Sequence, residues 1–132
     1  MIYGIGVDVL EVRRIEVLYA RYGGRLAARM LMPEEQLQFD TAKRPVRFLA
    51  MRFAAKEAIV KAMGTGFANG VWIRDVGAVQ NRLGKPEVVY SARGDALRHK
   101  LGVGDGHVTL TDEAGLIVAV AVLERSRRRR RA

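Results

Sequence analysis

Apolar and polar residues alternate along residues 2–10, and this period of two is typical of a β-strand. The two faces of the strand differ in character. One face carries Ile5, Val7 and Val9, and the opposite face carries Gly4, Gly6 and Asp8. A face of two glycines and an aspartate packs a core poorly, but it lets a ligand or another stretch of backbone come close. Asp8 also has a plainer explanation, as the cap of the helix that follows.

The rest of the first half has helical periodicity. In residues 11–22, apolar side chains recur at spacings of three and four, while the arginines fall off that stripe. Gly23-Gly24 ends this helix. Further helices are expected at residues 25–31, 33–39 and 45–63. The last of these is apolar almost all the way round, which indicates a helix that lies in the core.

Strand patterns dominate after Gly70. Extended segments are expected at residues 71–73, 76–79, 87–91, 107–111 and 116–123, with one short helix at residues 92–101. Residues 112–115, Asp-Glu-Ala-Gly, separate the last two strands and predict a β-hairpin. Helices in the first half and strands in the second predict an α+β fold, in which helices pack on a largely antiparallel sheet.

The composition excludes several kinds of site. The chain has 132 residues, enough for one domain with one core, and no cysteine, so it has no disulfide, thiolate metal site or cysteine nucleophile. His99 and His107 provide no zinc spacing and no Ser/His/Asp set. No signal peptide and no membrane-spanning run is visible, and we expect a cytoplasmic protein that is not bound to a membrane.

The positive charge is concentrated at the C-terminal end. The net charge is +9, and removing six arginines of the last eight residues, Arg125 and Arg127 to Arg131, leaves +3. A run of like charges is typical of a disordered tail, so we expect a domain over residues 1–124 and an arginine-rich tail over residues 125–132. The basic surface favours an acidic partner. A nucleic-acid-binding module is the alternative function, although the body has few aromatic residues on which bases stack.

Candidate chemistry lies in the central helix, where Glu57 and Lys61 are one turn apart. Asp8 and Glu57 are two carboxylates in unusual surroundings, and two protein oxygen ligands are a common way to hold Mg²⁺. Lys61 can place a point charge on a phosphate, and the loop Gly64-Thr65-Gly66 can add backbone N–H donors. These residues predict a site for a metal and a phosphate. The alternative is that Glu57 and Lys61 form an ordinary surface pair.

Several segments resemble the signatures of the holo-[acyl-carrier-protein] synthases, the small 4′-phosphopantetheinyl transferases. The first signature corresponds to residues 4–15, and the second, which is highly specific, to residues 52–66. The turn Gly84-Lys85-Pro86 and the strand at residues 107–113 fit the family as well. The resemblance covers residues 1–124 and implies the 4′-phosphopantetheinyl transferase-like fold.

The resemblance also implies an activity. Members transfer the 4′-phosphopantetheine group of coenzyme A to a serine of apo acyl carrier protein, with Mg²⁺. The products are holo acyl carrier protein and adenosine 3′,5′-bisphosphate, in support of fatty acid biosynthesis. Small members form homotrimers with active sites between subunits. By this resemblance the partners are acyl carrier protein and coenzyme A, and nucleic acid is not expected.

The family's site residues carry over by position. The catalytic residues are Asp8, Glu57 and Lys61, of which Asp8 and Glu57 bind the metal and Lys61 lies on the phosphates. The residues near the nucleotide are Arg52, Lys61, Gly64, Thr65, Gly66, Gly84, Lys85 and Pro86. The residues that dock the carrier protein are Arg13, Arg14 and Arg21. Asp112 stands where many relatives have histidine, so a mechanism that needs this histidine is not expected here.

Overall fold

The computed structural model describes residues 1–127, so residues 128–132 of the expected tail lie outside the described part. The elements, in chain order, are β1 (Ile2–Glu11), α1 (Val12–Tyr22), α2 (Gly24–Met30), α3 (Pro33–Phe39), α4 (Pro45–Met63), β2 (Val76–Gln80), β3 (Pro86–Tyr90), α5 (Ala92–Leu101), β4 (Val103–Glu113) and β5 (Leu116–Arg125). Strand β5 therefore ends one residue beyond the boundary expected at residue 124. The helix bounds lie within one residue of those expected from periodicity.

The five strands form two antiparallel sheets. One sheet has three strands in the order β1-β5-β4, and the other consists of the hairpin β2-β3. The prediction of an α+β fold with antiparallel pairing is confirmed. The strand expected at residues 71–73 is absent from the described structure, because Val71 and Trp72 join no sheet and a turn begins at Ile73. The backbone N–H of Trp72 donates to Asp75 Oδ2 at 2.9 Å, and the N–H of Asp75 donates to the carbonyl of Trp72, which closes a turn there.

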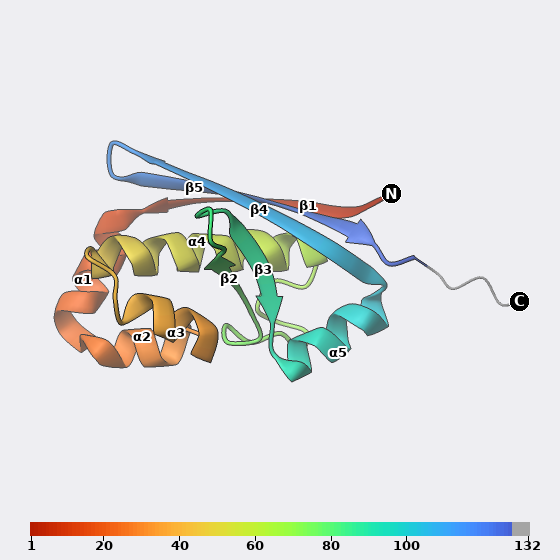
Figure 1. Cartoon of the computed structure of the whole chain (residues 1–132), viewed down its shortest axis with the longest axis horizontal. Coiled ribbons are helices and arrows are strands. Elements are labelled where there is room, and N and C mark those ends of the chain that lie inside the picture. Colours follow the sequence, from red (N-terminus) through yellow and green to blue (C-terminus); the bar gives the residue numbers. More distant parts are fainter. Residues whose placement is uncertain (128–132) are drawn as a thin grey trace, which may run out of the picture.

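Helix α4 lies directly beneath the three-stranded sheet, with α2 and α3 below it, while the β2–β3 hairpin flanks α4 and reaches β4 (Figure 1). The glycine face of β1 makes the contact with α4. A Cβ atom built on Gly4 would lie 2.0 Å from the carbonyl oxygen of Ala62, and one on Gly6 would lie 2.0 Å from that of Ala58. The glycines therefore let the helix backbone approach the strand. Asp8, two residues further along the same face of β1, is carried to the same side as α4.

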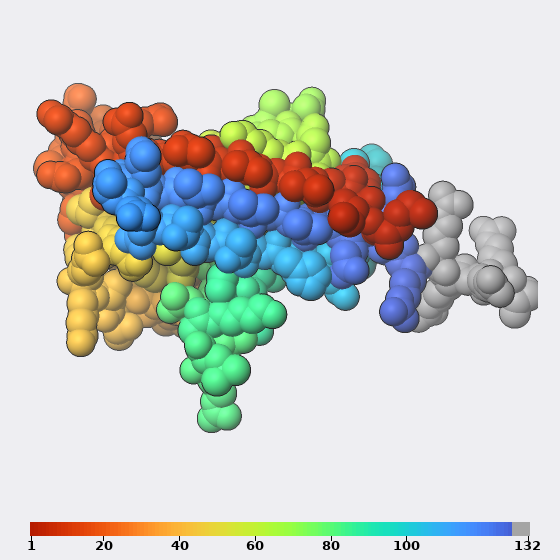
Figure 2. All heavy atoms as spheres, turned by 90° about the horizontal axis from the view of Figure 1, so that it is seen from above, coloured from red at the N-terminus to blue at the C-terminus, as the bar shows by residue number. Residues whose placement is uncertain are grey.

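The apolar face of β1 points away from this core. Ile5, Val7 and Val9 are 59%, 49% and 58% exposed. Figure 2 looks onto the outer face of the sheet, where β1, β5 and β4 lie side by side and the β2–β3 hairpin projects to one side. The alternation expected for residues 2–10 is present, but the glycine face packs inward while the apolar face is uncovered.

The core is centred on α4, which is buried on most of its circumference as expected. Leu49, Ile59 and Val60 are fully buried, and Ile117 and Leu123 of β5 pack into the same cluster. Within residues 1–127, no helix has the length and apolar character needed to cross a membrane.

Candidate active site

Asp8 and Lys61 meet where β1 crosses α4. Lys61 Nζ lies 3.1 Å from Asp8 Oδ1 and donates a second hydrogen bond, of 3.0 Å, to the carbonyl oxygen of Val7. The Asp8 side chain is 14% exposed and that of Lys61 is 49% exposed. The Asp8 carboxylate is therefore mostly buried, and the Lys61 side chain that pairs with it is more exposed to solvent.

Glu57 belongs to the same cluster, one turn before Lys61 on α4. Its pKa is raised, first because burial disfavours the charged carboxylate and then because the negative charge of Asp8 is close. The positive charges of Lys61 and Arg14 oppose this rise. The structure therefore brings together the three residues predicted to be catalytic, and it places Arg14 near them.

The donor set of this cluster fits Mg²⁺. In the part of the chain that the structure describes, no group of three or more His, Cys, Asp or Glu side chains gathers in a way that would hold a metal. Two carboxylates leave most coordination positions to water and to substrate oxygens, which is how Mg²⁺ is usually bound. A divalent cation between Asp8 and Glu57 would also relieve the repulsion that contributes to the raised pKa of Glu57.

The loop Gly64-Thr65-Gly66 follows Lys61 closely in the chain, but its backbone N–H groups already donate hydrogen bonds to α4. Gly64 has φ 81° and ends α4 in the left-handed conformation. Its N–H donates to the carbonyl of Lys61, and the N–H groups of Thr65 and Gly66 donate to the carbonyl of Val60. The expectation of free N–H donors here is therefore wrong for this conformation, because the helix terminus uses them.

Arg52 lies elsewhere, facing α3 and the β2–β3 hairpin. It is 3% exposed, its guanidinium lies 4.4 Å from the centre of the Phe48 ring, and burial lowers its pKa. It lines a cavity of about 460 Å³ whose other basic residues are Lys43, Arg44 and Arg47. No acidic residue lines this cavity. Its positive walls favour an anion.

Asp112 pairs with Arg47, one of the basic residues of this cavity. Its carboxylate accepts two hydrogen bonds from Arg47, of 2.6 Å from Nε and 3.0 Å from Nη2. This pairing lowers the pKa of Asp112. The Asp112 carboxylate thus fixes the orientation of an arginine on α4.

The turn Gly84-Lys85-Pro86 lies at the tip of the β2–β3 hairpin. Gly84 has φ 80°, which favours glycine, and the Asn81 side chain accepts hydrogen bonds from the N–H groups of Leu83 and Lys85. Lys85 and Pro86 line a groove of about 720 Å³ between the hairpin and β4. Asn81 lines both this groove and the cavity beside Arg52, so the two hollows adjoin at the hairpin.

The arginine-bearing face of α1 borders an apolar groove. Arg13, Arg14 and Arg21 are exposed, as expected for residues off the apolar stripe. Leu18 is 39% exposed, although it lies on that stripe, because it lines a groove of about 220 Å³ with Arg14 and Leu26. The face therefore combines positive charge with uncovered apolar surface.

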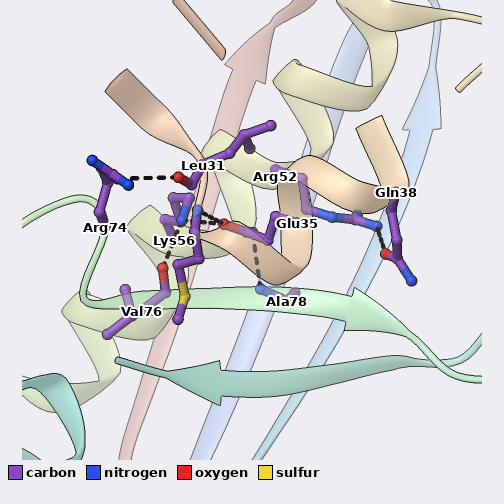
Figure 3. Close-up of polar contacts among 9 residues, drawn as sticks. Leu31, Glu35, Gln38, Arg52, Lys56, Arg74, Val76 and Ala78 are labelled. Carbon is purple, nitrogen blue, oxygen red and sulfur yellow. Dashed lines mark hydrogen bonds and ion pairs between the residues drawn. The ribbon is translucent and has the colours of Figure 1, made fainter. Parts of the chain in front are cut away.

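Sequence reasoning missed the fully buried charges. Lys56 and Glu35 are both 0% exposed, and Lys56 Nζ lies 2.6 Å from Glu35 Oε1 (Figure 3). Burial lowers the pKa of Lys56, and the charge of Glu35 opposes this effect. One feature of the sequence indicated a buried lysine, because Lys56 lies in a helix that is apolar almost all the way round, four residues after Arg52. Glu35 gave no signal, because an acidic residue in the first turn of a helix is common.

Comparisons with known proteins place these features in a family. Residues 4–121 match the model of the 4′-phosphopantetheinyl transferase superfamily. The chain is 45% identical over 123 residues to a holo-[acyl-carrier-protein] synthase of Enterobacter sp., covering 93% of this chain and 98% of that one. It is 42% identical over 125 residues to the synthase of Neisseria meningitidis, covering 95% and 100%.

Solved structures give the same result. The crystal structure of the synthase from Neisseria meningitidis superposes with a TM-score of 0.89 at 41% identity, over 95% of this chain and 100% of that one. A synthase from Bacillus anthracis in complex with coenzyme A (3′,5′-ADP) gives a TM-score of 0.77 at 32% identity, over 96% and 99%.

Proposed function

Because the chain belongs to the 4′-phosphopantetheinyl transferase superfamily, we propose that it is a Mg²⁺-dependent holo-[acyl-carrier-protein] synthase. It transfers the 4′-phosphopantetheine group of coenzyme A to a serine of apo acyl carrier protein. The other product is adenosine 3′,5′-bisphosphate. The reaction takes place in the cytoplasm and supports fatty acid biosynthesis.

The observation that carries this proposal is the cluster of Asp8, Glu57 and Lys61 between β1 and α4. In the reaction, the serine hydroxyl gives up its proton to solvent, its oxygen bonds to the β-phosphorus of coenzyme A, and the bond from that phosphorus to the oxygen of adenosine 3′,5′-bisphosphate breaks. Asp8 and Glu57 are the residues that hold Mg²⁺, which when bound neutralises charge on the diphosphate. Lys61, which is half exposed, moves its ammonium from Asp8 to the diphosphate and stabilises the leaving phosphate.

The nucleotide of coenzyme A meets residues from separate parts of the fold. Arg52 and its basic cavity suit a phosphate, and the turn at residues 84–86 provides a further contact. As the family resemblance implies, we propose a homotrimer with active sites between subunits. The uncovered apolar face of β1, formed by Ile5, Val7 and Val9, supports such association.

The carrier protein docks on α1. Arg13, Arg14 and Arg21 attract an acidic helix, and the groove beside Leu18 accepts apolar side chains from it. Arg14 belongs to this docking surface and also lies near Glu57, because its positive charge lowers the pKa of Glu57. Docking at α1 therefore delivers the acceptor serine next to the diphosphate.

A direct test uses the protein, coenzyme A, Mg²⁺ and an apo acyl carrier protein, with intact-mass spectrometry of the carrier. We expect the carrier to gain the mass of one phosphopantetheine group. A carrier whose acceptor serine is changed to alanine is the control and should gain nothing. Absence of the gain on a carrier that another phosphopantetheinyl transferase modifies would refute the proposed activity.

A further inference from the structure

Helix α3 contacts α4 and β2 through one side chain on each of two successive turns. The first is Glu35, whose Oε1 accepts hydrogen bonds from Lys56 Nζ at 2.6 Å and from the N–H of Met32 at 2.9 Å. Its other oxygen, Oε2, accepts from the N–H of Ala78 at 3.1 Å. Lys56 in turn donates to the carbonyl of Val76 at 2.6 Å (Figure 3). One buried carboxylate thus joins two helices and a strand.

The second contact is Gln38, one turn further along α3. Its Nε2 donates to the carbonyl of Gln80 at 3.0 Å, and its Oε1 accepts from the N–H of Gln80 at 3.1 Å. Strand β2 pairs with β3 along one edge only. The other edge of β2 carries backbone N–H and carbonyl groups that could pair with a further strand. Side chains form hydrogen bonds with these groups instead, namely those of Lys56, Glu35 and Gln38.

These bonds also fix which end of the Gln38 amide faces α4. Because Nε2 is committed to the Gln80 carbonyl, Oε1 is presented to Arg52, and Arg52 Nη2 donates to it at 3.3 Å (Figure 3). In residues 1–127, Gln38 is the one hydrogen-bond partner of the Arg52 guanidinium. Arg52 Nε is buried and has no partner in that range. The ring of Phe48 supports the guanidinium plane from one side.

Arg52 is therefore a desolvated cation whose orientation depends on one amide, at the wall of a cavity with three further cationic side chains. The charge of Glu35 acts on Arg52, but within residues 1–127 no carboxylate accepts a hydrogen bond from the guanidinium, so an anionic ligand can still pair with it. We propose that Gln38 is a positioning residue, which fixes the Arg52 guanidinium so that it binds a phosphate of the nucleotide half of coenzyme A. This inference rests on the proposed function, and it assigns Gln38 no contact with the reacting atoms.

The test compares Gln38→Met with Gln36→Met. Both changes replace a glutamine of α3 by a side chain of similar length, but the Gln36 amide bonds only Asp40 on the surface. Gln80 is exposed, so water replaces the bonds that Gln38→Met removes there, and the variant folds. By isothermal titration calorimetry, we expect Gln38→Met to bind adenosine 3′,5′-bisphosphate about tenfold more weakly than wild type. Gln36→Met should match wild type, and both variants should keep the wild-type KM for carrier protein.

A second comparison separates positioning from a general structural effect. If Gln38 acts through Arg52, adding Gln38→Met to Arg52→Met should weaken nucleotide binding no further. Equal weakening by Gln38→Met with and without Arg52 would overturn the inference, as would unchanged binding by Gln38→Met. Failure of the wild-type protein to bind adenosine 3′,5′-bisphosphate or coenzyme A would instead overturn the proposed function, and this inference with it.

Discussion

Lys61 Nζ lies 3.1 Å from Asp8 Oδ1, so the ammonium proposed to act on the diphosphate is paired with a carboxylate proposed to hold the metal. The two residues are 53 positions apart in the chain and are brought together by the packing of the β1 glycines on α4. A cation that binds Asp8 repels the ammonium from it. We therefore expect metal binding at Asp8 to be coupled to the release of Lys61 toward the substrate.

Replacing Lys61 by methionine tests this coupling. Without a competing ammonium, Lys61→Met should bind Mn²⁺ a few-fold more tightly than wild type, measured by electron paramagnetic resonance with Mn²⁺ alone. The same variant should transfer phosphopantetheine about a hundredfold more slowly, because a cation that stabilises the leaving phosphate is gone. Weaker Mn²⁺ binding by Lys61→Met would contradict the proposed coupling.

Val7→Glu tests the proposed association of copies through the outer face of the sheet. A carboxylate in the middle of an apolar interface carries a large desolvation cost, so the variant should sediment as a monomer in analytical ultracentrifugation. Val17→Glu on α1 is the matched control, because Val17 is 60% exposed and Val7 49%. The control should keep the wild-type sedimentation. A Val7→Glu protein with unchanged sedimentation would rule out this face as the interface.

Arg21→Glu tests the docking surface without touching the metal-binding cluster. Reversal of a positive charge on α1 should raise the KM for acyl carrier protein about tenfold and leave the KM for coenzyme A unchanged. Lys100→Glu on α5, at the opposite end of the molecule (Figure 1), makes the same charge reversal at another exposed residue. If both variants raise the KM for the carrier equally, only the overall charge matters and α1 has no special role.

Tyr90→Phe tests a buried hydroxyl on β3, at a residue that also lines the groove beside Lys85 and Pro86. The Tyr90 hydroxyl has no hydrogen-bond partner within residues 1–127, and burial raises its pKa to about 12. The unfolded chain ionises a tyrosine near pH 10, so this group lowers the free energy of unfolding as the pH rises from about 10 to about 12. The loss is roughly 3 kcal/mol for two pKa units.

Removal of that hydroxyl should leave the stability at pH 7 unchanged or about 1 kcal/mol higher, because an unpaired buried polar atom is lost. Urea unfolding at pH 7 and at pH 11 measures both effects. The difference in stability between these two pH values should be smaller in Tyr90→Phe than in wild type. A variant that is clearly less stable at pH 7 would show that the hydroxyl has a partner.

The sequence predicted the local elements well, because periodicity reports which residues share a face. It also identified Asp8, Glu57 and Lys61, and the structure brings these three together. Periodicity does not report which face is covered. The glycine face of β1 packs on α4 because two missing Cβ atoms admit the helix backbone, and Val7 on the other face stays exposed.

The interactions that no local pattern reveals join residues distant in the chain. Glu35 and Lys56 are 21 residues apart, and Arg47 and Asp112 are 65 residues apart. Lys56 stands out only because its helix is apolar almost all the way round, and the other three residues resemble ordinary polar residues of a helix or turn. Their pairing depends on the packing of α3 on α4 and on the position of the β4–β5 hairpin. A three-dimensional fold is needed before such pairs can be assigned.

The central claim is that Asp8 and Glu57 support Mg²⁺-dependent transfer, and one measurement tests it most directly. Transfer from coenzyme A to apo carrier is followed by intact-mass spectrometry against Mg²⁺ concentration, for wild type and for Glu57→Gln, with circular dichroism to confirm that both are folded. Wild type should transfer with Mg²⁺ and stop when EDTA is added, and Glu57→Gln should be at least about a hundredfold slower at every Mg²⁺ concentration. Transfer by wild type that persists in EDTA, or near wild-type rates for Glu57→Gln, would contradict the account.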